Sequence, residues 1–451
     1  MLYLWDMRRL LALTTSLVLT TSFILAAPSF GASPKAKAGG KCIKLGETRS
    51  IGSLSLSCTK SGKKLIWKLI SINPNKPTTS TTTTFKASIP ITLPVSQNGA
   101  ITFANVPTKI DDLGQVAWQK VQDVLSTNTA PTTISNDVHV GPNTKISITG
   151  GLSRIQEILA RAQKTFSGFT QVKTFSMLIY NAKDEPWAET EWSSFATARG
   201  YFAGQIMGEK NTIAGNCRST ISPGVFSGEI TNCGGADSSA IQNKDDAILT
   251  FGESDSGTSG DTYINNGGVV GHEYVHAVQA AQWIGNPKVY CTAATNSPDC
   301  FRSHWVNNTI PCWLNEGSAN SIGPLIASKS LSEYLDYRKN NLPYGQGPTT
   351  VTDYSEQSLK DYLFKQVIGD RGCISDGSVY RLGYTVGALA AEILTAIGGP
   401  QSVMALYSLG AEGSDFPTAF AKVYGISWSE ASSIIAKTLA AEYATFGPAP
   451  K

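Results

Sequence analysis

The sequence is poor in histidine and has no closely spaced pair of cysteines. Only four His occur in 451 residues, and none of the eight Cys belongs to a Cys-x-x-Cys pair. The missing pair argues against a thiolate zinc site, because such sites usually take ligands from motifs of that spacing. After residue 33, no segment is apolar over the roughly 18 residues that a membrane helix needs. We therefore expect neither a zinc finger nor a further membrane span.

The first 33 residues have the pattern of a secretory signal peptide. Arg8 and Arg9 precede an apolar run over residues 10–27, and small residues follow up to Ala32. The run is short for a spanning helix and no stop-transfer charges follow it, so residues 1–33 are expected to be cleaved. The alternative is an uncleaved membrane anchor. The mature chain is then expected to be secreted or associated with the cell surface.

Export changes how the eight Cys are interpreted. In an oxidising compartment, an even number of Cys favours disulfide bonds over thiol chemistry. Connectivity cannot be deduced from sequence. Proximity along the chain suggests four pairs: Cys42–Cys58, Cys217–Cys233, Cys291–Cys300 and Cys312–Cys373.

Residues 34–73 form a small basic module. Residues 35–76 carry ten Lys or Arg against the single acid Glu47. Two strand-like runs, Ser50–Cys58 and Lys64–Ile72, predict a disulfide-stapled hairpin, because a domain this small needs a covalent staple. Its charge could hold the module to anionic cell-wall polymers or lipid headgroups. The alternative is a merely solvated Lys-rich face.

The module resembles small repeats on exported actinobacterial proteins in its Lys, Gly, paired Cys and terminal Leu-Ile-Trp. Residues 74–87 follow it and are rich in Pro and Thr, without apolar periodicity. Such a segment cannot bury a core and is predicted to be a linker.

The rest of the chain has ordinary globular composition and is long enough for two lobes. We divide it into an N-terminal extension, residues 88–149, and a main domain, residues 150–451. The expected class is α+β, with a mixed first lobe and a mainly helical second lobe. Predicted helices cover Gln115–Leu125, Ser153–Phe166 (capped by Ser153), Leu331–Lys339, Ser358–Ile368, Tyr384–Ile397, Pro400–Leu409, Phe416–Tyr424 and Ser427–Tyr443; predicted strands cover Ser135–Ile148, with a turn at residues 141–142, Lys173–Tyr180 and Asp246–Phe251, while 186–206 is ambiguous.

Residues 271–276, Gly-His-Glu-Tyr-Val-His, contain the motif with the clearest chemistry. His272 and His276 are four residues apart, so on a helix they share one face, about 5–6 Å apart at Cβ. Two imidazoles at that spacing can bind one zinc ion, and Glu273 can serve as a general base beside it. The flanking residues are apolar on most sides, which predicts a buried helix whose polar groups need a partner. A metal ion is such a partner. The alternative is a chance match.

The run Trp-Leu-Asn-Glu-Gly, residues 313–317, lies downstream of this motif and contains a candidate third zinc ligand. His-Glu-x-x-His followed by this run resembles the gluzincins, the zinc metallopeptidases that include thermolysin and aminopeptidase N. The resemblance implies a zincin-like two-lobe fold, one catalytic zinc, and Glu316 as the third ligand. It also places Asn320 beside a zinc His, where thermolysin has an Asp. A neutral amide raises the basicity of the ligand less than a carboxylate does.

Two further points qualify the ligand set. Thirty-nine residues separate His276 from Glu316, about twice the usual gluzincin spacing. The excess falls around Tyr290–Asn308, where Cys291 and Cys300 could close an inserted surface loop. Such an insertion costs little free energy, because loop-closure entropy grows slowly with length. His304, inside that insertion, is a rival third ligand.

The segment 379–387 extends the resemblance. Aminopeptidase-type gluzincins carry a Tyr-x-x-Gly here, and Tyr384 with Gly387 fits it. Tyr384 is therefore implied to donate a hydrogen bond to the developing oxyanion. Tyr380, one turn earlier, is the alternative donor, and a simple core role for Tyr384 also remains open.

The sequence thus predicts an exported zinc metallopeptidase that acts on peptides or proteins. An edge strand near Asp246–Phe251 is expected to align the substrate by main-chain pairing. No Gly-x-Met-Glu-Asn precedes His272, which favours an endopeptidase over an aminopeptidase. The alternatives are an inactive zincin-fold surface or adhesion protein, and a hydrolase of cell-wall peptide amides.

Overall fold

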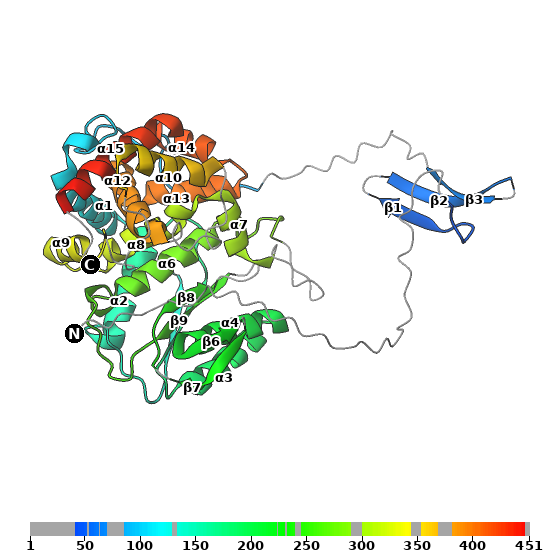
Figure 1. Ribbon diagram of the computed structural model, residues 1–451, viewed down its shortest axis with the longest axis horizontal. Coiled ribbons are helices and arrows are strands. Elements are labelled where there is room, and N and C mark those ends of the chain that lie inside the picture. The colour runs from blue at the N-terminus through cyan, green and yellow to red at the C-terminus, as the bar shows by residue number, and fades with distance from the viewer. Residues whose placement is uncertain are drawn as a thin grey trace, which may run out of the picture. The chain divides into compact units, whose positions relative to one another are not determined.

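The computed structural model describes residues 41–51, 54–62, 64–69, 85–128, 133–222, 224–230, 232–239, 245–289, 300–343, 353–368 and 381–446 (Figure 1). These residues belong to two compact units, one before residue 83 and one from residue 83 onward. The division falls within the segment 74–87, which the sequence predicts to be a linker.

The first unit is a three-stranded antiparallel sheet of β1 (Thr48–Ile51), β2 (Leu54–Ser61) and β3 (Lys64–Leu69). The predicted hairpin is β2–β3, and the first predicted strand is divided into β1 and β2. The predicted disulfide Cys42–Cys58 is present. Its two Cys and Trp67 make up the small buried core. This core is so small that the covalent link is a large part of what stabilises the unit.

The second unit contains a four-stranded sheet in the order β4 (Ser135–Val140), β5 (Thr174–Tyr180), β9 (Asp246–Gly252) and β8 (Ala236–Ser239). The first three strands are parallel, and β8 is antiparallel to β9. Every residue of β9 is buried. Because β9 pairs with β5 on one side and with β8 on the other, the prediction of an edge strand at Asp246–Phe251 is wrong. A continuous apolar run is typical of a strand covered on both faces, whereas the real edge, β8, is short and polar.

Helices cover both faces of the sheet. Alternate side chains of β5 and β9 pack on opposite sides, against α2 (Gly151–Thr165) and α6 (Gly268–Ala281) on one face and against α3 (Glu185–Ala198) and α4 (Ala203–Cys217) on the other. The ambiguous segment 186–206 thus belongs to two helices. The predicted cap at Ser153 is wrong, because α2 begins one turn earlier, after Gly150.

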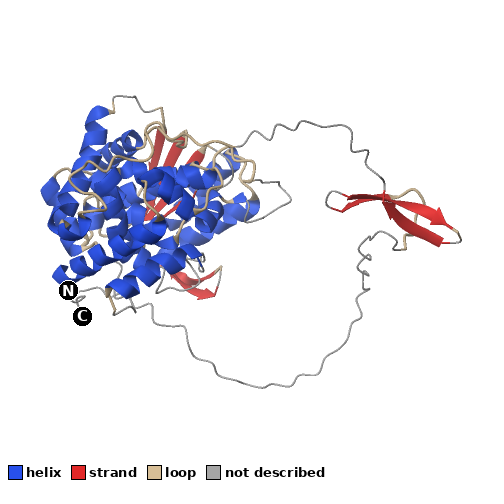
Figure 2. Cartoon of the chain, turned by 90° about the horizontal axis from the view of Figure 1, so that it is seen from above, coloured by secondary structure: helices blue, strands red, loops and turns tan. Residues whose placement is uncertain are grey.

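The residues after β9 form the second part of this unit, and every element described there is a helix. Figure 2 shows helices surrounding the strands of the sheet. The fold is mixed α+β and mainly helical, as predicted at that coarse level. The remaining elements are η1 (Val106–Thr108), η2 (Ile110–Asp112), α1 (Leu113–Thr127), the hairpin β6 (Arg218–Ser222) and β7 (Val225–Ile230), α5 (Thr262–Asn265), α7 (Arg302–Thr309), α8 (Cys312–Ala327), α9 (Leu331–Asn340), α10 (Glu356–Ile368), the π-helical η4 (Gly383–Gly387), α12 (Ala388–Gly398), α13 (Pro400–Ala411), α14 (Phe416–Tyr424) and α15 (Trp428–Phe446).

The predicted N-terminal extension, residues 88–149, belongs to the same core. Its helix α1 packs on α12 and α9, and its strand β4 pairs with β5. Figure 1 shows α6 between the sheet and the helices that include α8. The residues of the candidate motif therefore lie where the two parts of the unit meet.

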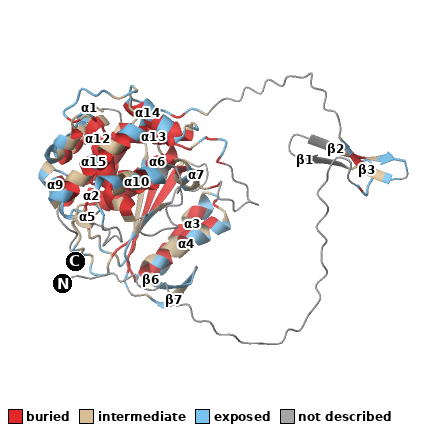
Figure 3. Cartoon of the chain, turned by 45° about the horizontal axis from the view of Figure 1, so that its top comes forward, coloured by how far each residue is buried: buried red, intermediate tan, exposed pale blue. Residues whose placement is uncertain are grey.

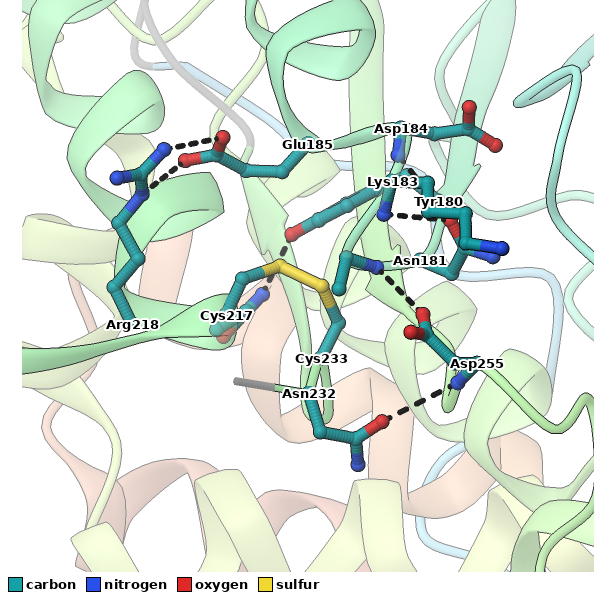
Figure 4. Close-up of a disulfide and its surroundings, with 12 residues drawn as sticks. Tyr180, Asn181, Lys183, Asp184, Glu185, Cys217, Arg218, Asn232, Cys233 and Asp255 are labelled. Carbon is teal, nitrogen blue, oxygen red and sulfur yellow. Dashed lines mark hydrogen bonds and ion pairs between the residues drawn. A yellow bond between two sulfur atoms is a disulfide. The ribbon is translucent and has the colours of Figure 1, made fainter. Parts of the chain in front are cut away.

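A second predicted disulfide, Cys217–Cys233, joins the end of α4 to the residues before β8 (Figure 4). Next to it, Arg218 makes two hydrogen bonds of 2.7 Å to the buried carboxylate of Glu185. On the other side, Asn232 accepts from the backbone N–H of Asp255 at 3.2 Å. The disulfide thus attaches the segment before the edge strand to α4, while the two neighbouring contacts reach α3 and the loop after β9.

Glycines let α8 approach its neighbours closely. A Cβ on Gly323 would lie 2.4 Å from the backbone N of His272, and one on Gly271 would lie 2.5 Å from the carbonyl O of Gly323. A Cβ on Gly317 would lie 2.3 Å from the backbone of Gly387. Since backbone atoms cannot yield as a flexible side chain does, α6, α8 and η4 reach this spacing only with glycine at these positions.

Some predictions fall outside the described residues: the signal peptide 1–33, Tyr380, and the pairings of Cys291 and Cys373. Cys300 and Cys312 are disulfide-bonded. Within the described part of the chain, no single helix is long and apolar enough to span a membrane, and only the pair Gly383–Gly398 and Pro400–Ala411, bent by 106°, passes that test jointly.

Candidate metal centre and catalytic cleft

The motif lies on α6, as predicted, and the helix is buried on nearly all sides. It begins after Gly267, whose φ of +79° is a conformation that L residues rarely adopt. His272 and His276 are one turn apart on the face toward α8, with ring centroids 4.7 Å apart. The predicted third ligand, Glu316, lies on α8 and faces both rings.

Three ligand atoms converge at this point. Nε2 of His276 lies 3.0 Å from Nε2 of His272 and 3.2 Å from Oε2 of Glu316. Nε2 of His272 lies 3.8 Å from the same oxygen. A tetrahedral zinc site with bonds of about 2.0–2.1 Å requires ligand atoms about 3.3–3.4 Å apart. Because the observed distances bracket that value, the donor set and its spacing fit one zinc ion.

The pKa values describe the metal-free state of this group. Burial, aided by the charge on His276, lowers the pKa of His272 to about 3. Burial also works against charge on His276, but its ion pair with Glu316 outweighs that and raises its pKa to about 9. In Glu316 the same ion pair overcomes burial and lowers the pKa to about 2. Without metal, a proton on His276 therefore balances the carboxylate, and a metal ion would replace that proton.

Gln279, one turn beyond His276, orients the ring of His276. The sequence analysis did not identify this residue. Its Oε1 lies 2.7 Å from Nδ1 of His276. Its amide nitrogen donates to the carbonyl of Asn315 at 2.9 Å and contacts the hydroxyls of Ser318 and Tyr407. These partners fix the orientation of the amide, so its oxygen faces His276. Nδ1 of His276 must therefore donate a hydrogen bond to Oε1 of Gln279. The lone pair on Nε2 is then directed to the proposed metal position.

We expect Gln279→Met to weaken zinc binding by about 10–100-fold, the usual loss when a partner of a metal-binding His is removed. Met is similar in volume but offers His276 no comparable acceptor. Competition with a chromogenic chelator measures the affinity. The matched control is Gln282→Met on the same helix, whose amide donates to Thr170 and Val278. Equal zinc affinity in Gln279→Met and the wild type would refute the positioning role.

Asn320 lies beside His272, where the resemblance implied it. It is among the groups that raise the pKa of His272. Yet Nδ1 of His272 makes no hydrogen bond of ordinary geometry, and the side-chain amide of Asn320 donates to the carbonyl of Tyr384 at 2.7 Å. Asn320 therefore links α8 to η4 directly, and its effect on His272 is weaker than that of Gln279 on His276.

Glu273 is buried next to the ligands without belonging to the ligand group. Its carboxylate lies 4.0 Å from Nε2 of His272. Burial raises its pKa to about 8, while a hydrogen bond with Ser238 of β8 lowers it in part. This pKa, like those of the neighbouring groups, describes the metal-free state. The position of the carboxylate, beside the three converging groups but not among them, is what a general base requires.

Tyr384 lies in the site, on the short π-helical segment η4. Its ring is parallel to that of His272, with 6.0 Å between centroids and an angle of 4°. Its hydroxyl hydrogen-bonds Glu316 and helps to lower the pKa of that carboxyl. Single π-helical turns inside α-helices are often found at functional sites. Here the turn begins at Gly383, whose missing side chain leaves room for Glu316.

A cavity of 430 Å³ opens onto His272, His276, Glu316 and Glu273. Its other walls come from α4, the edge strand β8 and α7, and Tyr384 also lines it. The predicted surface loop at Tyr290–Asn308 needs correction. Residues 302–309 form α7, which buries Arg302 and Val306 and lines the cavity. Figure 3 shows buried residues gathered along the sheet and around α6.

His304, the rival ligand, lies on α7 and contacts Asn308. It does not belong to the group of His272, His276 and Glu316. Among the described residues, this is the one group of His, Cys, Asp or Glu side chains placed closely enough to hold a metal ion. Comparison with protein-family models, curated proteins and solved structures found no match.

Proposed function

We propose that this protein is a zinc-dependent metallopeptidase with a zincin-like two-lobe fold. The observation that supports it best is the convergence of His272, His276 and Glu316 at tetrahedral spacing, with the buried base Glu273 beside them and a cavity above. A bound zinc ion would supply Lewis-acid polarisation of the substrate carbonyl and a more acidic water.

The protein's own groups have separate roles in this mechanism. His272, His276 and Glu316 hold the ion, and Gln279 orients His276. Glu273 accepts a proton from the attacking water and passes it to the leaving amine. Each of these residues is buried or nearly so, which strengthens their electrostatic interactions.

The substrate would bind along β8. This strand pairs with β9 on one side, and Ala236, Asp237 and Ser238 line the cavity on the other. An extended peptide can add to such an edge through main-chain hydrogen bonds. We therefore propose that residues 236–239, and not residues 246–251, align the substrate by main-chain pairing. An extended binding strand suits an endopeptidase.

Zinc content tests the metal assignment. The chain without residues 1–33 should carry about one zinc ion, since the site has one set of three protein ligands. His272→Ala, His276→Ala and Glu316→Ala should each lose it, as measured by elemental analysis after dialysis. His304→Ala is the matched control and should keep it. Full zinc in Glu316→Ala would contradict the ligand set.

Tyr384→Phe tests the proposed oxyanion donor. Loss of one such donor costs on the order of 10²–10³ in kcat, and the effect appears in kcat because the hydroxyl acts on the transition state. The ring remains, so thermal stability should stay close to that of the wild type. The kinetics are measured at saturating zinc, because the hydroxyl also hydrogen-bonds Glu316. Lower stability with normal kcat would assign Tyr384 to packing instead, and Tyr380→Phe would then be the next variant.

Two other functions remain as alternatives. An inactive surface or adhesion protein would keep the fold and show no chelator-sensitive hydrolysis. A hydrolase of cell-wall peptide amides would use the same groups on a different amide, and digestion of muropeptides separates it from a protein-directed peptidase. The secreted location and the anionic-polymer contact also remain proposals.

A further inference from the structure

The first unit exposes apolar side chains on a basic loop. Ile43 is 91% exposed and Leu45 is 62% exposed, and Ile43 is the most exposed large apolar side chain in the described part of the chain. Both lie between Cys42 and Gly46, with the exposed Lys44 between them. Scattered single exposures are normal, but two on a single short loop call for an explanation.

The loop is held in this shape. The Cys42–Cys58 disulfide ties its start to β2. The backbone N–H of Cys42 donates to Leu65 at 3.2 Å, and that of Gly46 donates to Cys58 at 2.9 Å. Gly46 also has a positive φ of +82°. With both ends fixed to the sheet, Ile43 and Leu45 cannot turn inward to join the core around Trp67.

Lysines surround the same end of the unit. Lys41 and Lys44 flank Ile43, and Lys60 and Lys64 lie at the β2–β3 turn. Because Cys42 bonds to Leu65, next to Lys64, the loop lies near that turn. All four Lys are exposed. The result is a tip on which two exposed apolar side chains lie among four exposed Lys.

We propose that this tip docks on an anionic lipid bilayer. A purely anionic polymer would use the Lys and gain nothing from Ile43 and Leu45. The headgroup region accepts both, because apolar side chains enter its acyl boundary while Lys stay with the phosphates. A protein partner fits less well, since a stable interface buries about 800 Å² per partner and this tip is one short loop. The proposal does not depend on zinc or on peptidase activity.

Vesicle binding tests it. The chain is produced oxidised and without residues 1–33, so that the apolar N-terminus cannot bind lipid itself. It should sediment with phosphatidylcholine vesicles that contain phosphatidylglycerol, and only weakly with phosphatidylcholine alone. Molar salt should release it, since the screening length falls to about 3 Å. Lys44→Gln should lower the affinity about five-fold.

The decisive variant is Ile43→Ser/Leu45→Ser, which leaves every charge in place. It should bind phosphatidylglycerol vesicles at least about ten-fold more weakly, from the apolar area removed. The matched control is Ile221→Ser/Val225→Ser, an exposed apolar pair on β6 and β7 of the other unit, at 71% and 50% exposure. That control should bind as the wild type does. Mass analysis after alkylation verifies that Cys42–Cys58 is intact in each protein.

A second readout does not depend on affinity. In Leu45→Trp, emission should shift to shorter wavelength with phosphatidylglycerol vesicles and be quenched by brominated lipid. Wild-type affinity in Ile43→Ser/Leu45→Ser, or no binding of the wild type to anionic vesicles, would overturn the proposal. So would self-association that this variant abolishes, which would assign the loop to a second copy of the chain.

Discussion

Glu273→Gln is expected to lower peptide hydrolysis by about 10²–10⁴-fold, the contribution that general acid–base catalysis typically makes. The amide keeps the size and burial of the side chain but cannot accept a proton. Zinc content should not change, because Glu273 is not one of the three converging ligands. The measurement is kcat/KM on a peptide library with zinc determined in the same sample.

The matched control for that experiment is Glu253→Gln. Glu253 is also buried, its pKa is also raised by burial, and it accepts from the backbone N–H of Ser147 at 2.9 Å. It does not line the cavity. Its substitution should leave turnover unchanged. Wild-type hydrolysis by Glu273→Gln, with zinc bound, would contradict the proposed mechanism.

Arg338→Met is expected to lower the free energy of unfolding by about 3–5 kcal/mol. Arg338 on α9 donates to both carboxylate oxygens of Glu392 at 2.9 Å and also pairs with Glu442 on α15. Glu392 and Glu442 are fully buried. Removing the cation leaves both carboxylates without their charge partner. Urea or thermal unfolding at neutral pH measures the loss.

Glu442→Gln provides the contrasting variant. One cation faces two carboxylates here, and burial together with Glu392 raises the pKa of Glu442 to about 7. An unfolded Glu has a pKa of about 4.3, so the folded state binds this proton more tightly. The associated stability is complete below that unfolded value and is lost as the pH rises through about 7.

Glu442→Gln should therefore remove this part of the pH dependence and be at least as stable as the wild type at about pH 8. At neutral pH, Arg338→Met should be the less stable of the two variants, because it removes the only cation in the triad. Equal stability of Arg338→Met and the wild type at neutral pH would show that the triad contributes nothing.

The gluzincin resemblance stays a proposal, and the geometry of the candidate metal site is a separate observation. The resemblance named Glu316 from five neighbouring residues. The structure independently brings its carboxylate to 3.2 Å from His276 across thirty-nine intervening residues. Solving this chain with a peptide hydroxamate bound would test the ligands, the base and the role of β8 together.

The parts of the site that depend on local spacing could be predicted from the sequence. His272 and His276 share a face because they are four residues apart on one helix, and Glu273 follows from the same motif. Likewise Cys42–Cys58 and Cys217–Cys233 are close in sequence, and both pairs are present. The spacing of apolar residues in the C-terminal part of the chain also predicted the helices there, with ends that agree with the structure to within a few residues.

Other parts were decided only by the tertiary structure, because they depend on which element covers which. The apolar run of β9 could be a strand at any place in a sheet, and only pairing with β8 makes it internal. Gln279 is an ordinary helix residue until Asn315, Ser318 and Tyr407 fix its amide. Residues 302–309 become a cavity wall by packing. Local spacing in the sequence indicated which residues could bind a metal ion. Long-range packing determined which side chains orient these residues and which elements form the cavity around them.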